Sequence, residues 1–477
     1  MFVVSLWVIS PFFVSAAQAG PSCDMWYRDA DGDGHGDPSL SMRLCSPPPA
    51  GIAVLSGTDC DDTRATVYPG GAELCDGFDN NCDGIIDEDG VVSVDDGTVH
   101  PTIQAAVDAA SDGAVVHICE GTYPEAVLIR TDLTLLGRGA GATVIDGSSA
   151  PAPTSTVRVQ SATVTLDGLT LTGGTGTFND GMTWGGGLYT GGSRGVNVRD
   201  CIIEGNTADI GGGVAGTSLF LWSDRYLDTV IRDNMATSGA GGFLLFSADL
   251  RGVEVTGNTA TIGGGGGAWY WTVSADATTR IHDNSADFGG GLWLWDDGVW
   301  SGGQIDHNSA SMVGGGVWSD DNSELSDVSV SNNTAGFGGG GLGLFGADLA
   351  ATGVVVDGNT APDGAGVWAR TASAALAGGA ISGNVATTDG GGVTVGNGAF
   401  VRLDGVDVWS NDAGGAGGGA HVDGGTLQSV DSDWGVALGD NTPDDVTVVV
   451  GAAETSYVDI GTDETFTCSD ADGGCVW

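Results

Sequence analysis

The chain has 477 residues, of which 86 are glycine, and its 62 Asp and Glu residues face only 14 basic residues. The resulting net charge of -48 excludes binding to nucleic acid, or to anionic lipid through a basic patch. Because 41% of the residues are hydrophobic, the composition indicates a folded acidic protein and not a disordered one. After residues 1–19 no apolar run is long enough to cross a bilayer, so we expect no transmembrane span in the mature chain.

Residues 1–19 are predicted to be a secretory signal peptide. The run MFVVSLWVISPFFVSAAQA is apolar and ends in Ala17-Gln18-Ala19, which is a small-x-small cleavage signal. We therefore expect a protein that is secreted or held at the outer cell surface.

Export would place the nine cysteines in an oxidising compartment. Since nine is an odd number, at least one thiol is free or pairs with another molecule. Short local loops favour two disulfides, Cys75 with Cys82 and Cys468 with Cys475. The second of these would close a C-terminal tail at residues 461–477.

Residues 20–89 form an acidic, cysteine-rich module in which the carboxylates fall into a repeated frame. Residues 29–37 read D-x-D-x-D-G-x-x-D, and residues 79–87 read D-x-N-x-D-G-x-x-D. Alternating oxygen ligands, a glycine at the sixth position and a carbonyl at the seventh let one short loop wrap a hard cation. The predicted ligands are Asp29, Asp31, Asp33, Asp37, Asp79, Asn81, Asp83 and Asp87, with the carbonyls of His35 and Ile85.

Neither loop has the Glu at position twelve that closes an EF-hand, because Leu40 and Gly90 stand there. We expect the missing ligands to come from Asp59, Asp61 or Asp62 in the intervening TDCDD, or from Glu88. The alternative is a solvated loop rich in Asp and Gly, which the repetition of the frame argues against.

The segments WYRDADGDGHGD and TDCDDTRATVYPGGAELCDGFDNNCDGIIDED resemble the MopE-type metal-binding repeat of secreted bacterial proteins, which is similar to thrombospondin type 3 calcium repeats. That family is named partly for copper. The ligands in this chain are oxygens, with no Met cluster and His35 as the single imidazole, so hard-cation chemistry favours calcium.

Residues 90–460 carry a repeat with a period near 25 residues. An N-x-A triplet recurs nine times, at spacings of 24 to 28 residues, with a branched apolar residue three positions before it and a glycine cluster after it. This pattern predicts an all-β fold, a single-stranded parallel β-helix with one repeat per rung and about fourteen rungs. We expect the recurring Asn to form a tight turn in the left-handed conformation and to bond to the Asn above and below.

The start of this array has a helical pattern. Residues 101–112 place Ile103, Ala106, Val107 and Ala110 on one face, with Gly113 as a stop, which predicts a short helix that caps the β-helix core. PTIQAAVDAASDGAVVHICEGTYPE resembles the first segment of pectate-lyase-like right-handed β-helices. The N-x-A and GGG units are similar to the repeats of polymorphic outer-membrane adhesins.

Pectate-lyase-like folds include lyases, hydrolases, esterases and plain adhesins, so activity has to be argued from a site. The best candidate combines acidic pairs on successive rungs with two histidines close in register. Single aspartates in turns are more often solvated than catalytic, so we assign no catalytic residue. The candidate residues are Asp296, Asp297, Asp320, Asp321, His282 and His307.

Tryptophans follow the glycine clusters at positions that alternate with core residues. The first residue after each cluster is apolar and is expected to face the core, so the next one should point outward. We expect this outward strip to bind polysaccharide, with a covered or self-stacking structural ladder as the alternative. Its tryptophans are Trp269, Trp271, Trp293, Trp295, Trp318 and Trp368.

Together these patterns predict a calcium-binding β-helix protein that acts as an adhesin-like, polysaccharide-binding module outside the cell. Two alternatives remain. One is a polysaccharide lyase or glycoside hydrolase on the same fold, and the other is a structural surface protein that binds no ligand.

Overall fold

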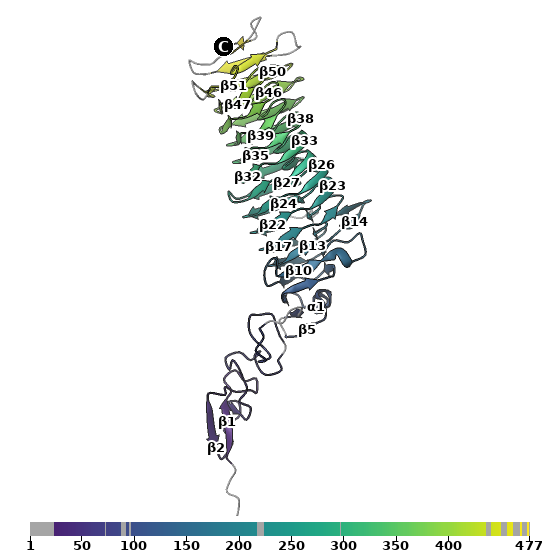
Figure 1. Cartoon of the computed structure of the whole chain (residues 1–477), viewed down its shortest axis with the longest axis vertical. Coiled ribbons are helices and arrows are strands. Elements are labelled where there is room, and N and C mark those ends of the chain that lie inside the picture. Colours follow the sequence, from purple (N-terminus) through teal and green to yellow (C-terminus); the bar gives the residue numbers. More distant parts are fainter. Residues whose placement is uncertain are drawn as a thin grey trace, which may run out of the picture. The chain divides into compact units, whose positions relative to one another are not determined.

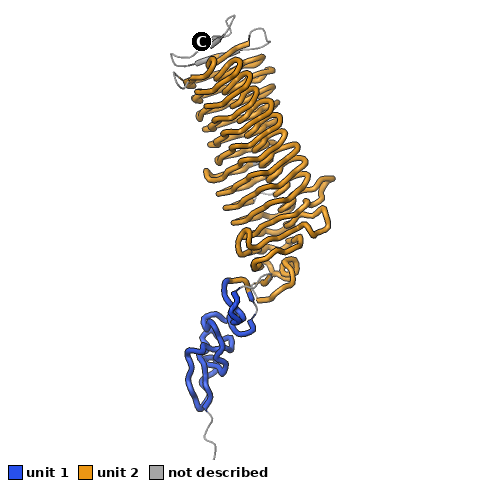
Figure 2. Tube along the Cα trace, viewed as in Figure 1, with its two compact units in different colours: residues 1–73, 77–87 blue, residues 74–76, 88–477 orange. Residues whose placement is uncertain are grey.

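The computed structural model describes residues 23–71, 73–86, 92–94, 97–216, 224–295, 297–435, 440–449, 456–460, 468–469 and 475–476. The signal peptide predicted at 1–19 lies outside this part of the chain. Two compact units are distinguished in Figure 2, one made of residues 1–73 and 77–87 and the other of residues 74–76 and 88–477. Within the described residues, no helix has the length and apolar character to cross a membrane.

The N-terminal unit contains a small antiparallel sheet and is otherwise built of turns. Strand β1 (Asp24–Arg28) lies between β2 (Ser41–Leu44) and β3 (Ala53–Val54). A disulfide between Cys23 and Cys45 joins the ends of β1 and β2, and a second one joins Cys60 to Cys82. With so little regular structure, these crosslinks take over much of the role that a hydrophobic core has in a larger domain.

The disulfide predicted between Cys75 and Cys82 is wrong. Cys82 is bonded to Cys60, and Cys75 is bonded to Cys119 at the start of the β-helix. A short separation in the sequence lowers the entropic cost of closing the loop, but it does not set the direction in which a cysteine side chain points. Both cysteines have a left-handed backbone, with φ of 55° and 59°, and their side chains take partners on different segments. Cys201 is the buried free cysteine, which agrees with the odd count, and the side chains of Cys468 and Cys475 lie outside the described part.

The β-helix unit begins with strands β4 (Val92–Val94), β5 (Val99–His100) and β6 (Ala114–Ile118), and helix α1 (Ile103–Ala109) lies between β5 and β6. The hydroxyl of Thr102 caps the helix by accepting the N–H of Ala105 at 3.0 Å. The Glu125 carboxylate accepts two further N–H groups at the same end, both at 2.9 Å. This helix lies in the segment for which the sequence predicts a cap, and it buries Ile103, Ala106 and Val107.

A parallel β-solenoid of about twelve turns follows (Figure 1). It has fewer turns than the fourteen expected. One strand per rung forms a 12-stranded parallel sheet. Its strands are β7 (Gly121–Tyr123), β10 (Thr143–Asp146), β13 (Thr170–Thr172), β18 (Ile202–Glu204), β22 (Val230–Arg232), β25 (Glu254–Thr256), β28 (Arg280–His282), β32 (Gln304–Asp306), β36 (Ser329–Ser331), β40 (Val355–Asp357), β44 (Ala380–Ser382) and β48 (Asp407–Trp409).

Two other sheets complete each rung. A 9-stranded sheet follows the Asn turn, and a 29-stranded sheet, with up to two strands per rung, follows the glycine cluster. Strands β24 (Phe243–Arg251), β27 (Gly267–Ala275), β30 (Leu292–Leu294) and β31 (Gly298–Ser301) belong to the larger sheet. The 9-stranded sheet consists of β19 (Thr207–Ala208), β23 (Met235–Ala240), β26 (Thr259–Gly264), β29 (Ser285–Phe288), β33 (Ser309–Val313), β37 (Thr334–Ala335), β41 (Thr360–Ala361), β45 (Val385–Ala386) and β49 (Asp412–Ala413).

The apolar column after the glycine clusters lines the main core as expected, with one exception. Phe243 pairs with Gly267 and Gly267 pairs with Leu292, so Gly267 and not Ala268 takes the core position on its rung. The run of five glycines before Ala268 made the start of this repeat ambiguous in the sequence. The alternation of inward and outward positions is therefore shifted by one residue on this rung.

A ladder of asparagines runs along the turn between the 12-stranded and 9-stranded sheets. Each Asn except the last, Asn441, donates its Nδ2 to the Oδ1 of the Asn on the next rung over 2.9 to 3.0 Å, and the ladder is almost completely buried. The predicted bonding between asparagines is thus confirmed. The members are Asn206, Asn234, Asn258, Asn284, Asn308, Asn333, Asn359, Asn384, Asn411 and Asn441.

The left-handed conformation expected for these asparagines occurs one residue earlier. All nine residues that precede the predicted asparagines have φ between 53° and 65°. The preceding residue makes the sharp turn, and the Asn itself keeps an ordinary backbone while its amide bonds across rungs. The left-handed residues are Gly205, Asp233, Gly257, Asp283, His307, Asn332, Gly358, Gly383 and Ser410.

Candidate functional site

The two acidic loops of the N-terminal unit each contain the same kind of backbone turn. Asp33 Oδ1 accepts the N–H of His35 at 2.8 Å, and Asp83 Oδ1 accepts the N–H of Ile85 at 2.9 Å. The intervening Gly34 and Gly84 have φ of 97° and 98°, a conformation that glycine adopts without a steric penalty. The repeated sequence frame therefore corresponds to a repeated local structure.

Carboxylates from two separate segments meet beside the first loop. One oxygen from each of Asp29, Asp31 and Asp33 lies within 4.8 Å of the others, and the same holds for Asp31, Asp59 and Asp62. Asp31 belongs to both groups. The structure thus brings part of the TDCDD segment, at Asp59 and Asp62, to the first loop.

Asp59 gives the strongest indication that this cluster binds a cation. Only 3% of the residue is exposed, and its Oδ2 has no hydrogen-bond partner in the described structure. Burial raises the pKa of this carboxyl, and the neighbouring Asp33, Asp31 and Asp62 raise it further. A buried carboxylate surrounded by others is costly unless a cation compensates the charge. Asp31 Oδ2 and Asp33 Oδ2 are likewise buried without a partner, so the cluster fits a hard cation.

Two of the predicted ligands make other contacts. Asp37 accepts the N–H and the hydroxyl of Ser39 at 2.7 and 2.6 Å, and Asp61 is bound by Thr63 and Arg64. Hydrogen bonds from Ser39 and Thr63, respectively, are the main causes that hold the pKa values of Asp37 and Asp61 below the usual range.

In the second loop, Asp79 Oδ1 and Asn81 Oδ1 accept the N–H of Asp83 at 3.1 and 2.8 Å. Glu73 Oε1 accepts the N–H of Asn81 at 2.8 Å, and Glu73 is 7% exposed. The sequence analysis missed Glu73, because it lies outside both frames and no spacing rule points to it. Asp87 and Glu88 lie outside the described residues.

The tryptophans predicted to form a water-facing strip are more buried than expected. Trp318 and Trp368 are 7% and 4% exposed, whereas Trp293 and Trp295 are partly exposed. We call Phe288, Trp293, Trp295, Trp318, Phe337 and Trp368 the outer aromatic cluster; Phe288, Trp293, Trp318 and Trp368 pack with Val313 in a group separate from the main core.

Residues from the preceding rung cover the two buried tryptophans. Phe288 lies 5.4 Å from Trp318 between ring centroids, and Phe337 meets Trp368 edge-on at 5.8 Å. Both phenylalanines stand directly before a glycine cluster. Alternation along a strand gives the side on which a residue lies but not what covers it, so the expected exposure of Trp318 and Trp368 is wrong. The Phe-Gly dipeptide repeated in both rungs was the signal that could have shown this cover.

Trp269 and Trp271 take other positions in the register. Trp269 pairs with Leu245 and Leu294, which belong to the main core, because of the shift at Gly267. Trp271 lies where the register between β24 and β27 shifts at a bulge. Trp269 thus shares the register position of Leu245 and Leu294. The side chains of Trp269 and Trp271 lie outside the described part, so their outward position stays a prediction.

Trp293 and Trp295 form the accessible part of the outer aromatic cluster. Their rings stack with centroids 4.8 Å apart and an angle of 6° between the planes. Trp293 Nε1 donates to Asp320 Oδ1 on the next rung at 2.8 Å. Burial raises the pKa of Asp320, an effect that this hydrogen bond partly opposes.

The histidines of the catalytic candidate lie away from its aspartates. His282 ends β28 in the 12-stranded sheet, with its ring nitrogens 3.0 Å from Glu254 and 2.6 Å from Asp283. His307 follows β32 in the same sheet and lies 2.9 Å from Asp306. Asp297 and the pair Asp320-Asp321 stand instead in turns between strands of the 29-stranded sheet, and Asp296 lies outside the described residues.

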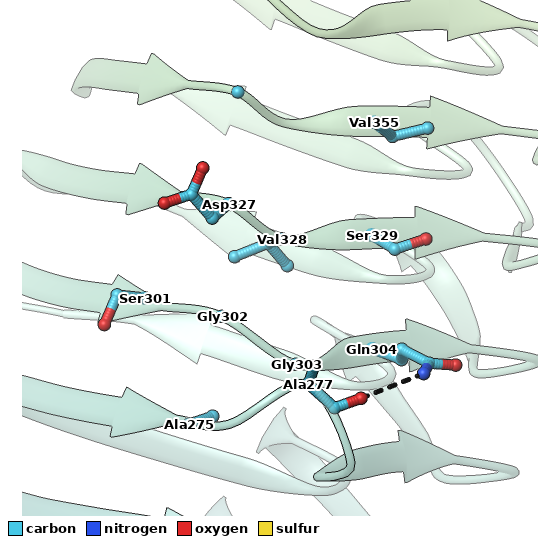
Figure 3. A pocket seen from close by; sticks show the side chains of 11 residues that line it. Ala275, Ala277, Ser301, Gly302, Gly303, Gln304, Asp327, Val328, Ser329 and Val355 are labelled. Carbon is cyan, nitrogen blue, oxygen red and sulfur yellow. Dashed lines mark hydrogen bonds between the residues drawn. The ribbon is translucent and has the colours of Figure 1, made fainter.

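A groove of about 630 Å³ crosses several rungs at the turn that leads into the 12-stranded sheet (Figure 3). Its floor is made of small residues, including Gly302, Gly303 and Gly353. Gln304 in the wall donates to the carbonyl of Ala277 at 3.2 Å. The groove has no aromatic or basic side chain, so the outer aromatic cluster offers the better recognition surface on the β-helix.

A model of the Cu-binding MopE family, a metal-binding motif, matches residues 59–88. These residues carry the MopE-type metal-binding motif. No curated protein matches the chain. The A-module of the Azotobacter vinelandii mannuronan C-5 epimerase AlgE6 is a similar solved structure, with 16% sequence identity, a TM-score of 0.27, and coverage of 77% of this chain and 94% of that chain.

Proposed function

We propose that this protein is secreted or held at the cell surface, that its N-terminal unit binds calcium, and that its β-helix binds polysaccharide. The observation that carries the calcium assignment is the buried Asp59 carboxylate, which has an unpartnered oxygen and lies in a group with Asp31 and Asp62. An all-oxygen cluster suits calcium better than copper, which prefers nitrogen or sulfur ligands. Three disulfides agree with an oxidising compartment.

Calorimetric titration of the full-length mature protein tests the metal. We expect calcium to bind with a Kd of about 0.1 to 1 mM, as in extracellular modules. Asp59→Asn should weaken calcium binding at least about tenfold, since it removes a ligand charge from the cluster. Asp24→Asn, at an exposed position on β1, is the matched control and should leave the affinity unchanged. Absence of heat with calcium, or displacement of calcium by equimolar copper, would reject this assignment.

Polysaccharide binding is supported by the partly exposed Trp293 and Trp295 at the edge of a buried aromatic cluster. Indole rings bind the apolar faces of sugars, and rungs spaced about 4.8 Å apart repeat at nearly the length of one sugar unit. A panel of neutral, acidic and amino-substituted polysaccharides tests the proposal. Retention of the protein on none of them would reject it.

We expect no depolymerisation of these polymers. Among the described residues of the catalytic candidate, the two histidines are held by other carboxylates in a different sheet from Asp297 and Asp320. Incubation with pectin or alginate should release neither unsaturated nor reducing ends. If such ends appear and Asp320→Ala abolishes them, the lyase or hydrolase alternative is correct.

A further inference from the structure

An arginine without a carboxylate partner lies on the outer face of the first rungs. Arg158 is the middle residue of β11 (Val157–Val159), and its two neighbours face the main core, so its side chain points away from that core. Arg158 Nε is buried and has no hydrogen-bond partner in the described structure. Most other arginines of the β-helix unit form ion pairs with Asp or Glu, whereas Arg158 forms none with the described residues. In a chain with 62 acidic and 14 basic residues, a guanidinium without an acidic partner is unusual.

The groups around Arg158 compensate its charge only in part. Arg158 pairs in register with Tyr189 on the next rung, and its guanidinium carbon lies 5.7 Å from the centroid of the Tyr189 ring. The face of an aromatic ring attracts a cation, but it accepts few of the five N–H groups of a guanidinium. The carboxylate of Glu125, at the beginning of the same rung face, instead accepts two N–H groups at the start of α1. A partly buried guanidinium therefore keeps donors for a ligand.

Arg158 lines a pocket of about 290 Å³, which we call the Arg158 pocket. Its walls come from β8 (Val127–Ile129), from residues 153–155 and from β14 (Thr177–Asn179). Strand β14 pairs with β15 (Met182–Trp184) in a hairpin that projects from the solenoid (Figure 1). The volume lies near the lower end of the range for small-molecule sites, about 300 Å³, and suits a ligand with a single sugar ring. The walls combine apolar side chains with hydroxyl groups, from Leu128, Pro153, Phe178, Thr154, Ser155 and Thr177.

Hydrogen bonds hold the hairpin wall of the Arg158 pocket in place. The hydroxyl oxygens of Ser155 and Thr177 lie 2.8 Å apart and are buried. Asp209 Oδ2 accepts the N–H and the hydroxyl of Thr183 at 2.8 and 3.0 Å. Phe178 lines the pocket from this wall and is 64% exposed, so its ring can contact a ligand. A wall that is already ordered keeps the entropic cost of binding low.

Charge indicates which ligand the pocket would take. Among the described residues that line it, Arg158 is the one that carries a charge. One guanidinium matches one carboxylate, which it can bind through two parallel hydrogen bonds. The net charge of -48 repels ligands with several negative charges, so a single carboxylate is favoured over a phosphate or a polyanion. The exposed Phe178 ring adds a surface for the apolar face of a sugar.

We propose that the Arg158 pocket binds the carboxylate of one sugar acid, which is either free or the terminal residue of an otherwise neutral chain. Arg158 holds the carboxylate, and Phe178 contacts the sugar ring. The pocket is separate from Trp293 and Trp295, so this inference goes beyond the proposed function and does not depend on it. Polysaccharide binding at those tryptophans should be unaffected by substitution of Arg158.

Calorimetric titration of the full-length mature protein with methyl glucuronoside and methyl glucoside tests the proposal. We expect the glucuronoside to bind at least about tenfold more tightly, because only this sugar offers a carboxylate to the guanidinium. Arg158→Gln should remove the preference, and Arg158→Lys should keep part of it, since Lys retains the charge but not the paired donors. Phe178→Ala should lower the affinity for both sugars without changing the melting temperature. Arg225→Gln removes the same charge at an exposed position of the same sheet and is the matched control.

A glucose hexamer that ends in one glucuronate distinguishes the two sources of the ligand. Tighter binding than that of methyl glucuronoside identifies a chain end, and equal binding identifies a free sugar acid. Equal affinity for the two methyl glycosides, or a preference that persists in folded Arg158→Gln, would overturn the inference. If glucose 6-phosphate or benzoate binds more tightly than methyl glucuronoside and depends on Arg158, the ligand class is wrong. Should Arg158→Gln lower the melting temperature, Arg158→Lys and Phe178→Ala decide, and unchanged affinity in both would reject the site.

Discussion

Asp224, the first residue of β21 (Asp224–Leu227), has a carboxyl buried in the β-helix. It is 2% exposed and accepts the N–H of Val196 at 2.9 Å and the hydroxyl of Thr190 at 3.4 Å. Burial raises its pKa to about 7, and these two hydrogen bonds only partly oppose the shift. The folded protein therefore keeps a proton on Asp224 at pH values where the unfolded chain has released it.

This carboxyl should make the β-helix less stable as the pH rises from about 4 to 7. The cost of ionising Asp224 is absent below the unfolded pKa and complete above the folded pKa, where it amounts to about 4 kcal/mol. Asp224→Asn keeps an acceptor for the Val196 N–H but cannot ionise. We expect the variant to gain stability relative to wild type between pH 5 and pH 8, as measured by urea unfolding at both values. A stability difference that does not change with pH would contradict this account.

Single positions also show the limits of what the sequence predicts. The Asp-Gly frames indicated the two acidic loops because each ligand position recurs at a fixed spacing within one segment. Glu73 was missed because its contact with Asn81 depends on how separate segments fold together. The cover over Trp318 was missed for a similar reason, since Phe288 lies on another rung and next to a register shift between Ala286 and Phe288.

The strands of the β-helix were easier to predict, because every rung repeats the same apolar positions, the same Asn and the same glycine cluster. The repeat period and the bonding between asparagines both followed from that regularity. The exception is the rung of Gly267, where five consecutive glycines removed the marker that sets the alternation of side chains. The hand of the coil stays a prediction from the resemblance.

One ladder position can be tested by removing its amide. In Asn308→Ala, the Nδ2 and the backbone N–H of Asn284 both lose the acceptor that they contact at 3.0 Å. Asn284 Nδ2 keeps its hydrogen bonds to the carbonyls of Val255 and His282, so one buried donor, the backbone N–H, is left unpaired. This should lower the free energy of unfolding by about 1 to 3 kcal/mol. Ser309→Ala, at the exposed neighbouring position, should change it by less than about 0.5 kcal/mol. Equal stability of the two variants in urea unfolding would show that the ladder contributes little.

The two compact units of the chain differ in what stabilises them. The β-helix has a continuous apolar core, whereas the N-terminal unit depends on disulfides and on a cluster of carboxylates whose repulsion a cation would relieve. The sequence indicated this division through the change from acidic frames to an N-x-A repeat.

Calcium should therefore stabilise only one unit. At 10 mM calcium and a Kd of about 1 mM, binding adds about 1.4 kcal/mol to the stability of the N-terminal unit. Differential scanning calorimetry of the full chain should show one transition that moves to higher temperature with calcium and returns with EDTA, and a second that does not move. Equal shifts of both transitions would contradict independent stabilisation.

The asparagine ladder has a definite beginning and a definite end. Asn206 Oδ1 accepts the N–H of Gly174, and Asn441 Nδ2 donates to Asp445, so non-repeating partners close both ends. Each amide in between repeats the same bonds, to the Asn of the next rung and to a carbonyl of the preceding one. A gene segment that encodes one whole period can be duplicated or lost by unequal recombination without leaving an amide unpaired. The number of rungs is thus free to vary over evolutionary time, whereas the two ends are not.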